Sequence, residues 1–132
     1  MAAAPPFAVE GLDHVVLLVD DLDTAEAFYR DVIGCRIERA VPKFGMLQMR
    51  AGAALIDLVD IASDAGSWAR PEVAGGRNVD HVCVAIGPFE ESAMLAHLAA
   101  HDVAIVEEGL RYGARGEARL STSGTRRATR SS

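Results

Sequence analysis

Two histidines in this 132-residue chain occupy matching places in two similar stretches, and imidazole can both bind a metal and transfer a proton. The stretches are LDHVVLLV at 12–19 and VDHVCVAI at 79–86. An aspartate precedes each histidine, and His14 and His81 are 67 positions apart (81 − 14 = 67). A single histidine in a strand is more often structural than a ligand. Their equivalent places in a repeat make both histidines candidates for a functional site.

The residues after His14 predict a β-α-β-β-β unit. Apolar residues at helical spacing follow the first strand, and Gly34 is suited to end that helix. Asp23 and Glu26 are placed as a capping box at its start. The remaining strands are expected at 35–41, 44–51 and 53–61.

The residues after His81 predict a shorter version of the same unit. A second apolar stripe begins at Phe89, and Glu90 and Glu91 fall in the first turn of the expected helix, where its dipole favours negative charge. A strand is expected at 103–109. Residues 62–78 contain three Gly, two Ser and one Pro and are interpreted as a linker. A repeat of this period indicates two duplicated units that bury a shared face.

The sequence resembles the vicinal-oxygen-chelate superfamily, which contains glyoxalase I, fosfomycin and bleomycin resistance proteins and extradiol dioxygenases. The resemblance rests on GLDHVVLLVDDLDTAEAFYRDVIG at 11–34, LIDLVDI at 55–61, RNVDHVCVAI at 77–86 and the glyoxalase-like loop GLRYGARGE at 109–117. It implies a single α+β domain of two βαβββ modules whose sheets curl around a cleft. We expect the first module at 11–61, the linker at 62–78 and a partial second module at 79–117 that lacks its C-terminal strands.

The resemblance also implies a divalent metal held by the first and last strands of both modules. Carried onto this chain, the ligands are His14, Asp57 and His81. Two histidines and one carboxylate suit Fe, Mn, Ni or Zn with open coordination positions. Asp57 is in addition the candidate catalytic base, although aspartate reaches less far than the glutamate usual in the family. The fourth ligand of the family, a glutamate near the end of a DPxGNxIEL stretch, has no counterpart here. We therefore expect the metal in the intact family form, and weak or no binding in this chain.

The end of the chain departs from the family pattern. Family members commonly continue YGAxGEGPSxYxxDPEGNxIEL, whereas residues 112–132 read YGARGEARLSTSGTRRATRSS. A permitted back-translation of residues 118–132, read two bases out of register, spells PSLYVRDPEGNPIE. We therefore predict that residues 118–132 are frameshifted. The competing interpretation is an ordinary basic, disordered tail, which composition alone would favour.

Four further residues are candidates for contacting a substrate. Met46 and Gln48 share one face of the strand expected at 44–51, and Arg111 and Tyr112 are placed to cover the cleft. Each is equally compatible with a solvated or a core position. His97 and His101 have an i,i+4 spacing that can hold zinc, but they lack the glutamate of the zincin pattern and are interpreted as surface residues.

Three functional interpretations follow. The leading one is a glyoxalase-like, metal-dependent lyase or isomerase, in which the metal binds two adjacent oxygens of a small substrate and stabilises an enediolate as a Lewis acid. The alternative is a metal-free binding protein of the antibiotic-resistance type. In the third, the chain has lost its site and is inactive in this form.

Composition restricts the partners. The net charge of −6 disfavours nucleic acid or an anionic membrane as the main partner. Cys35 and Cys83 lie in apolar surroundings, which suits a reducing cytoplasm better than a disulfide scaffold. A second module that lacks strands exposes a sheet edge, so we expect a homodimer.

Overall fold

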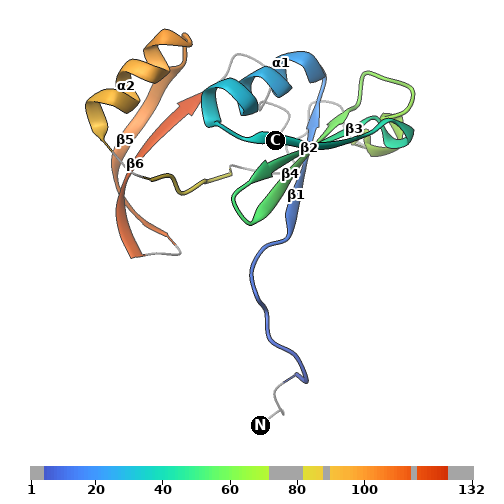
Figure 1. The fold of residues 1–132 in the computed structure, drawn as a ribbon, viewed down its shortest axis with the longest axis horizontal. Coiled ribbons are helices and arrows are strands. Elements are labelled where there is room, and N and C mark those ends of the chain that lie inside the picture. The colour runs from blue at the N-terminus through green and yellow to red at the C-terminus, as the bar shows by residue number, and fades with distance from the viewer. Residues whose placement is uncertain (1–4, 72–81, 88–89, 114–115, 125–132) are drawn as a thin grey trace.

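A computed structural model gives the α+β fold of the chain (Figure 1). It describes residues 5–71, 82–87, 90–113 and 116–124, with side chains described as far as Ile105. Two sheets are present in these residues: a four-stranded sheet in the first half of the chain and a two-stranded hairpin near its end. The α+β class predicted from the sequence is confirmed.

The four-stranded sheet forms the predicted first module. Its strands are β1 (His14–Val19), β2 (Arg36–Val41), β3 (Met46–Ala51) and β4 (Ala54–Asp60). They lie in the order β1-β4-β3-β2, with β1 parallel to β4 and the other pairs antiparallel. The helix between β1 and β2 carries the chain across the sheet, so that β2 lies at the edge opposite β1. The chain then returns through β3 to β4, which pairs with β1 and brings the two ends of the module together. His14 and Asp57 therefore come from adjacent strands.

The helical segment between β1 and β2 has two parts, α1 (Leu22–Ala27) and the π-helical turn η1 (Phe28–Ile33). Asp21 is the N-cap, because its carboxylate accepts a hydrogen bond from the backbone N–H of Thr24 at 3.1 Å. The predicted capping box was therefore placed two residues too late; Asp23 lies inside the first turn. Gly34 ends the segment with φ of 91°, a conformation that favours glycine, as expected.

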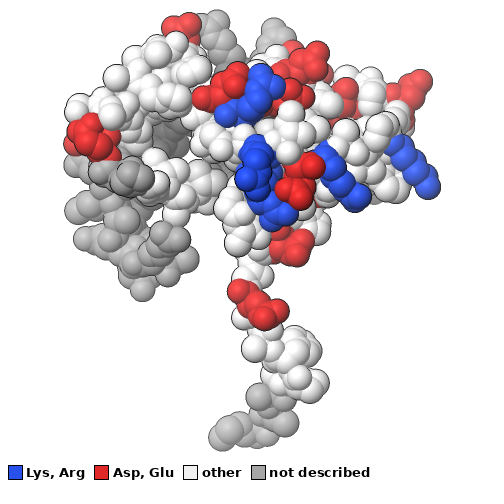
Figure 2. Space-filling view, viewed as in Figure 1, with Lys and Arg blue, Asp and Glu red and all other residues white. Residues whose placement is uncertain are grey.

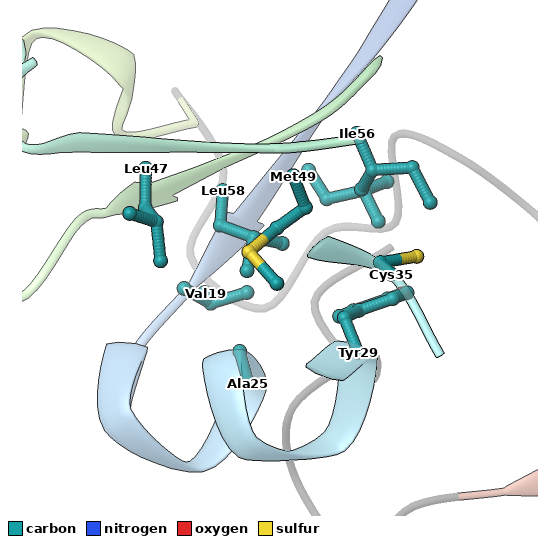
Figure 3. Close-up of a cluster of buried hydrophobic side chains, with 9 residues drawn as sticks. Val19, Ala25, Tyr29, Cys35, Leu47, Met49, Ile56 and Leu58 are labelled. Carbon is teal, nitrogen blue, oxygen red and sulfur yellow. The ribbon is translucent and has the colours of Figure 1, made fainter. Parts of the chain in front are cut away.

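The core of this half lies between the helical segment and one face of the sheet (Figure 3). Strand alternation sends every second side chain of β1, β3 and β4 into it. Ala25 and Tyr29 reach it from the helical side. Its fully buried members include Leu17, Met49 and Leu58. Each such side chain contributes about 1.5–3 kcal/mol through burial alone.

One side of the first half is closed by contacts between the β2–β3 turn and the loop after β4. A Cβ on Gly45, whose φ is 63°, would lie 2.6 Å from the backbone nitrogen of Gly66. The indole N–H of Trp68 donates to the Phe44 carbonyl at 2.9 Å, and the two rings meet edge to face. The loop after β4 and the β2–β3 turn are therefore closely packed against each other.

The second half contains α2 (Glu91–Ala100), β5 (Ala104–Gly113) and β6 (Gly116–Gly124). The helix and the strand predicted after it are confirmed, and β5 pairs antiparallel with β6. Residues 82–87 belong to no strand, unlike the prediction for 79–86; residues 79–81 lie outside the described residues. Strand β6 crosses positions 117 and 118, between which we predicted that the reading frame shifts. The frameshift itself stays a prediction.

Acidic and basic side chains are interspersed on the face shown in Figure 2. On α1 and η1, Arg30 bonds to both Glu26 and Asp31, and on the sheet Arg50 bonds to Glu38. Among the residues that the structure describes, no helix has the length and apolar character needed to cross a membrane.

Candidate functional site

The face of the sheet opposite the core carries a row of polar residues at its centre. The register places Arg39 beside Gln48, Gln48 beside Asp57, and Asp57 beside Val16. Because neighbouring residues in a ladder point to the same face, the polar row crosses β2, β3 and β4 and meets the apolar Val16 on β1. Asp57 is only 2% exposed and is the buried charged residue of the described part of the chain. A carboxylate buried at this depth requires compensation by hydrogen bonds, a cation or a proton.

Two hydrogen bonds supply part of that compensation. Arg39 Nε donates to Gln48 Oε1 at 2.8 Å, and Gln48 Nε2 donates to Asp57 Oδ2 at 3.3 Å. The other carboxylate oxygen, Asp57 Oδ1, is buried and has no hydrogen-bond partner among the described residues. An unpartnered buried carboxylate oxygen is costly in an empty site but useful as a metal ligand or proton acceptor.

His14 stands at the edge of the same face. Its Nδ1 lies 2.7 Å from Asp13 Oδ1, and its side chain is 48% exposed. This hydrogen bond, followed by the negative charge of Asp57, raises the pKa of His14 above its ordinary value. The contact occupies Nδ1 and leaves Nε2 available. Metal-binding histidines are commonly held in this way, by a carboxylate on the nitrogen that does not bind the ion.

The predicted ligands are therefore only partly brought together. His14 and Asp57 share one face of adjacent strands, and the unpartnered Asp57 Oδ1 fits a divalent ion. His81 lies outside the described residues. Within the residues that are described, no group of three or more His, Cys, Asp or Glu side chains could hold an ion.

The side chains of two of the four predicted substrate contacts are described. Gln48 touches Asp57, and Met46 lies on the same face two residues away, opposite Val59. Arg111 and Tyr112 lie in β5, opposite Ala118 and Glu117, but their side chains are outside the described part of the structure. His97 is exposed, and its Nε2 lies 2.9 Å from the Val32 carbonyl oxygen, so it links α2 to η1.

Sequence reasoning missed two residues of this site. Asp13 was visible in the repeat, since an aspartate precedes both histidines, but it was given no role. Arg39 carried no signal, because its place beside Gln48 depends on an irregularity in β2 between Ile37 and Arg39.

A groove of about 400 Å³ opens at the His14 end of the sheet. It runs between β1, the end of η1 and the segment Val82–Ile86, and its lining includes His14, Cys35 and Arg50. Its volume is within the range of small-molecule sites. Asp57 and Gln48 are not among its lining residues. His14 and Arg50 line the groove and also lie on the face of the sheet that carries Asp57.

This fold, a βαβββ sheet with a histidine on its first strand and a buried carboxylate on its fourth, defines a class of protein. The profile of the Glyoxalase/Bleomycin resistance protein/Dioxygenase superfamily matches residues 11–118, and the chain belongs to this superfamily.

The chain is also similar in sequence to two mitochondrial enzymes. The chain is 27% identical to the mitochondrial methylmalonyl-CoA epimerase of Bos taurus and 26% identical to that of Mus musculus, each over 122 residues. Those alignments cover 87% of this chain and 67% and 66% of the two relatives. The chain thus spans about two thirds of their length.

Solved structures support the fold. An integron cassette protein from the mobile metagenome of V. cholerae matches with a TM-score of 0.64 at 23% identity, over 89% of this chain and 88% of that one. A lactoylglutathione lyase from Agrobacterium tumefaciens matches with a TM-score of 0.56 at 25% identity, over 90% and 87% of the two chains.

Proposed function

We propose that this chain is built for metal-dependent isomerase or lyase chemistry on a small oxygenated substrate, with His14, Asp57 and His81 as ligands. The observation that carries the proposal is the buried Asp57 Oδ1 without a partner, one strand away from His14. The names of the relatives, an epimerase and a lyase, are consistent with it.

Two side chains on the polar face have roles in this proposal. Asp57 supplies one ligand oxygen and is the candidate acceptor for a proton next to a carbonyl group of the substrate. His14 supplies Nε2, because Asp13 occupies Nδ1. A divalent ion, when bound, supplies Lewis-acid stabilisation of negative charge on substrate oxygen. Gln48 and Met46 flank Asp57 and are placed to contact the substrate.

Calorimetric titration of the chelator-treated protein with Mn²⁺, Ni²⁺ and Zn²⁺ tests the proposal. Wild type should bind one ion, and His14→Ala, Asp57→Asn and His81→Ala should each abolish binding. His101→Ala is the matched control, because the His97 and His101 rings are 4.7 Å apart and could bind an ion themselves. Loss of binding in His101→Ala alone would place the ion on α2 and end the proposal.

Chemistry is tested separately by incubating the metal-loaded protein in D₂O with hydroxyaldehydes and methylmalonyl thioesters. Deuterium should appear at the carbon next to the carbonyl, and Asp57→Asn should remove this exchange. Exchange that survives in Asp57→Asn would contradict the role of Asp57 as base.

The second candidate is a metal-free small-molecule binder. The observation in its favour is the groove of about 400 Å³, whose lining includes the apolar residues Leu12, Val82, Val84 and Ile86. Saturable binding of an apolar dye, unchanged by chelator and by Asp57→Asn, would favour this function over the enzyme.

A homodimer is proposed for the assembly. Strand β1 lies at the edge of the four-stranded sheet, and Val82, Val84 and Ile86 are 40%, 37% and 55% exposed. Edge strands and exposed apolar residues both invite pairing. Light scattering at tens of micromolar should give twice the mass of 14.0 kDa, and a monomer would contradict it. A cytoplasmic location is also proposed, on the free thiols of Cys35 and Cys83.

A further inference from the structure

We infer that Arg39 is a positioning residue, which acts through Gln48 to decide which oxygen of Asp57 faces the site. The inference rests on the proposed function for its catalytic meaning. Its structural content, the coupling of three side chains across three strands, stands on the two hydrogen bonds alone.

The direction of the chain of hydrogen bonds is set at Arg39. A guanidinium has donors and no acceptor, so the side chain of Gln48 must turn its carbonyl oxygen toward Arg39. The amide nitrogen of Gln48 then points the other way and donates to Asp57 Oδ2. The Asp57 carboxylate, which only accepts, also selects the amide nitrogen, so both ends of the chain of bonds favour one orientation of Gln48. Without a donor at position 39, the amide oxygen loses its partner and Gln48 is held at one end only. Arg39 therefore holds the amide in place, and the amide holds Asp57 Oδ2.

An irregularity in β2 brings Arg39 to this place. Ile37 pairs with Met49, and in a regular ladder Glu38 would be the residue opposite Gln48. The register shifts between Ile37 and Arg39, so that Arg39 takes that position instead. Glu38 then bonds to Arg50 at 3.1 Å. Bulges often re-aim a side chain next to a functional site. Here the bulge places the cationic Arg39 opposite Gln48 in place of the acidic Glu38.

The consequence for the site is a carboxylate with one occupied and one free oxygen. Asp57 Oδ2 is held by Gln48, while Oδ1 is left for an ion or a proton. Arg39 is exposed and bonds to neither oxygen of Asp57, so it acts only through Gln48. Residues that orient ligands in this way typically change metal affinity by about 10–100-fold when replaced.

The side-chain amide of Gln48 is the direct reporter, and it is read by NMR in the chelator-treated protein. In wild type its two amide protons should resonate away from the positions of a solvent-exposed glutamine amide and exchange slowly with water. In Arg39→Met both signals should move toward those positions and exchange faster. Arg50→Met is the matched control, because Arg50 lies on the same face and bonds to Glu38 instead; there the signals should stay as in wild type. Unchanged Gln48 signals in Arg39→Met would overturn the inference.

Affinity for Mn²⁺ gives the functional half of the test. Arg39→Met and Gln48→Met should each weaken binding about 10-fold or more, and the double variant should be no weaker than either, since both break the same chain of bonds. Arg39→Lys should restore much of the affinity because lysine also only donates. Additive losses in the double variant would overturn the inference. If wild type binds no ion, the proposed function fails, and the NMR result alone decides the role of Arg39.

Discussion

The two halves of the molecule begin with similar sequences, but a complete βαβββ unit is described only in the first half. The first half closes a four-stranded sheet over a helix and buries a cluster of nine residues. The second half, as far as it is described, has the ten-residue helix α2 and one hairpin, and Leu98 is its buried side chain. Among the side chains that the structure describes, burial is therefore concentrated in the first half. The half with a closed core is expected to determine stability.

The largest test of this difference is a pair of core truncations. Leu58→Ala should lower the free energy of unfolding by about 3–5 kcal/mol, because Leu58 is 0% exposed and its removal leaves a cavity. Leu98→Ala should cost about 2 kcal/mol, the lower end for a buried leucine, because Leu98 keeps 8% of its surface exposed. Urea denaturation measures both. Equal losses would show that the second half is as tightly packed as the first.

Restoring the predicted reading frame should complete the second half. A chain that continues after Glu117 with a glycine and PSLYVRDPEGNPIE would carry the carboxylate that the family uses as fourth ligand. Loss of a residue that supports a metal site already costs about 10–100-fold, so the restored chain should bind Mn²⁺ or Ni²⁺ at least that much more tightly. Titration of both chains checks it. Equal, tight affinity in the two would mean that the present ending does not affect the site.

The helix caps provide a matched comparison of smaller size. Asp21 and Glu90 each accept backbone hydrogen bonds at the start of α1 and α2. Asp21→Ala should lower the free energy of unfolding by about 1 kcal/mol. Glu90→Ala should mainly reduce helical circular dichroism if α2 can open separately. A larger global loss from Glu90→Ala than from Asp21→Ala would reverse the ranking of the halves.

The cap of α2 also predicts a dependence on pH. Bonds from the Ser92 hydroxyl and the Ala93 backbone N–H lower the pKa of Glu90. A lowered pKa means that the cap contributes above the ordinary glutamate pKa of 4.5 and is lost as pH falls through the lower, folded value. Helicity lost below pH 4.5 should therefore be smaller in Glu90→Gln than in wild type.

The smallest expected effect concerns His14. Its pKa is raised by the hydrogen bond to Asp13 and then by the charge of Asp57, so the associated stability is full at low pH and is lost as pH rises through the raised value. NMR titration of the metal-free protein should give a midpoint above 6.5, and Asp13→Asn should bring it down. A midpoint unaffected by Asp13→Asn would remove Asp13 from the site.

Much of the first half could be predicted from the sequence, because apolar periodicity and Gly34 determine its strands and the end of its helix. His14 and Asp57 were proposed as ligands through a family resemblance. The link from Arg39 to Gln48 could not be predicted, since one extra residue in β2 exchanges Glu38 for Arg39 and leaves no mark in composition. The capping box was misplaced because Asp21 and Asp23 are both acceptable caps by residue type, and only the backbone chooses between them.

Trp68 gives the protein an intrinsic optical probe. It is the one tryptophan of the chain, and its indole bonds to the Phe44 carbonyl in the first half. Fluorescence emission will therefore follow the opening of the loop and turn around Gly45 and Gly66, whereas far-ultraviolet circular dichroism sums over both halves. Coincident transitions in the two signals would indicate a single cooperative unit. An early loss of ellipticity at constant emission would reveal an independently melting second half without any label.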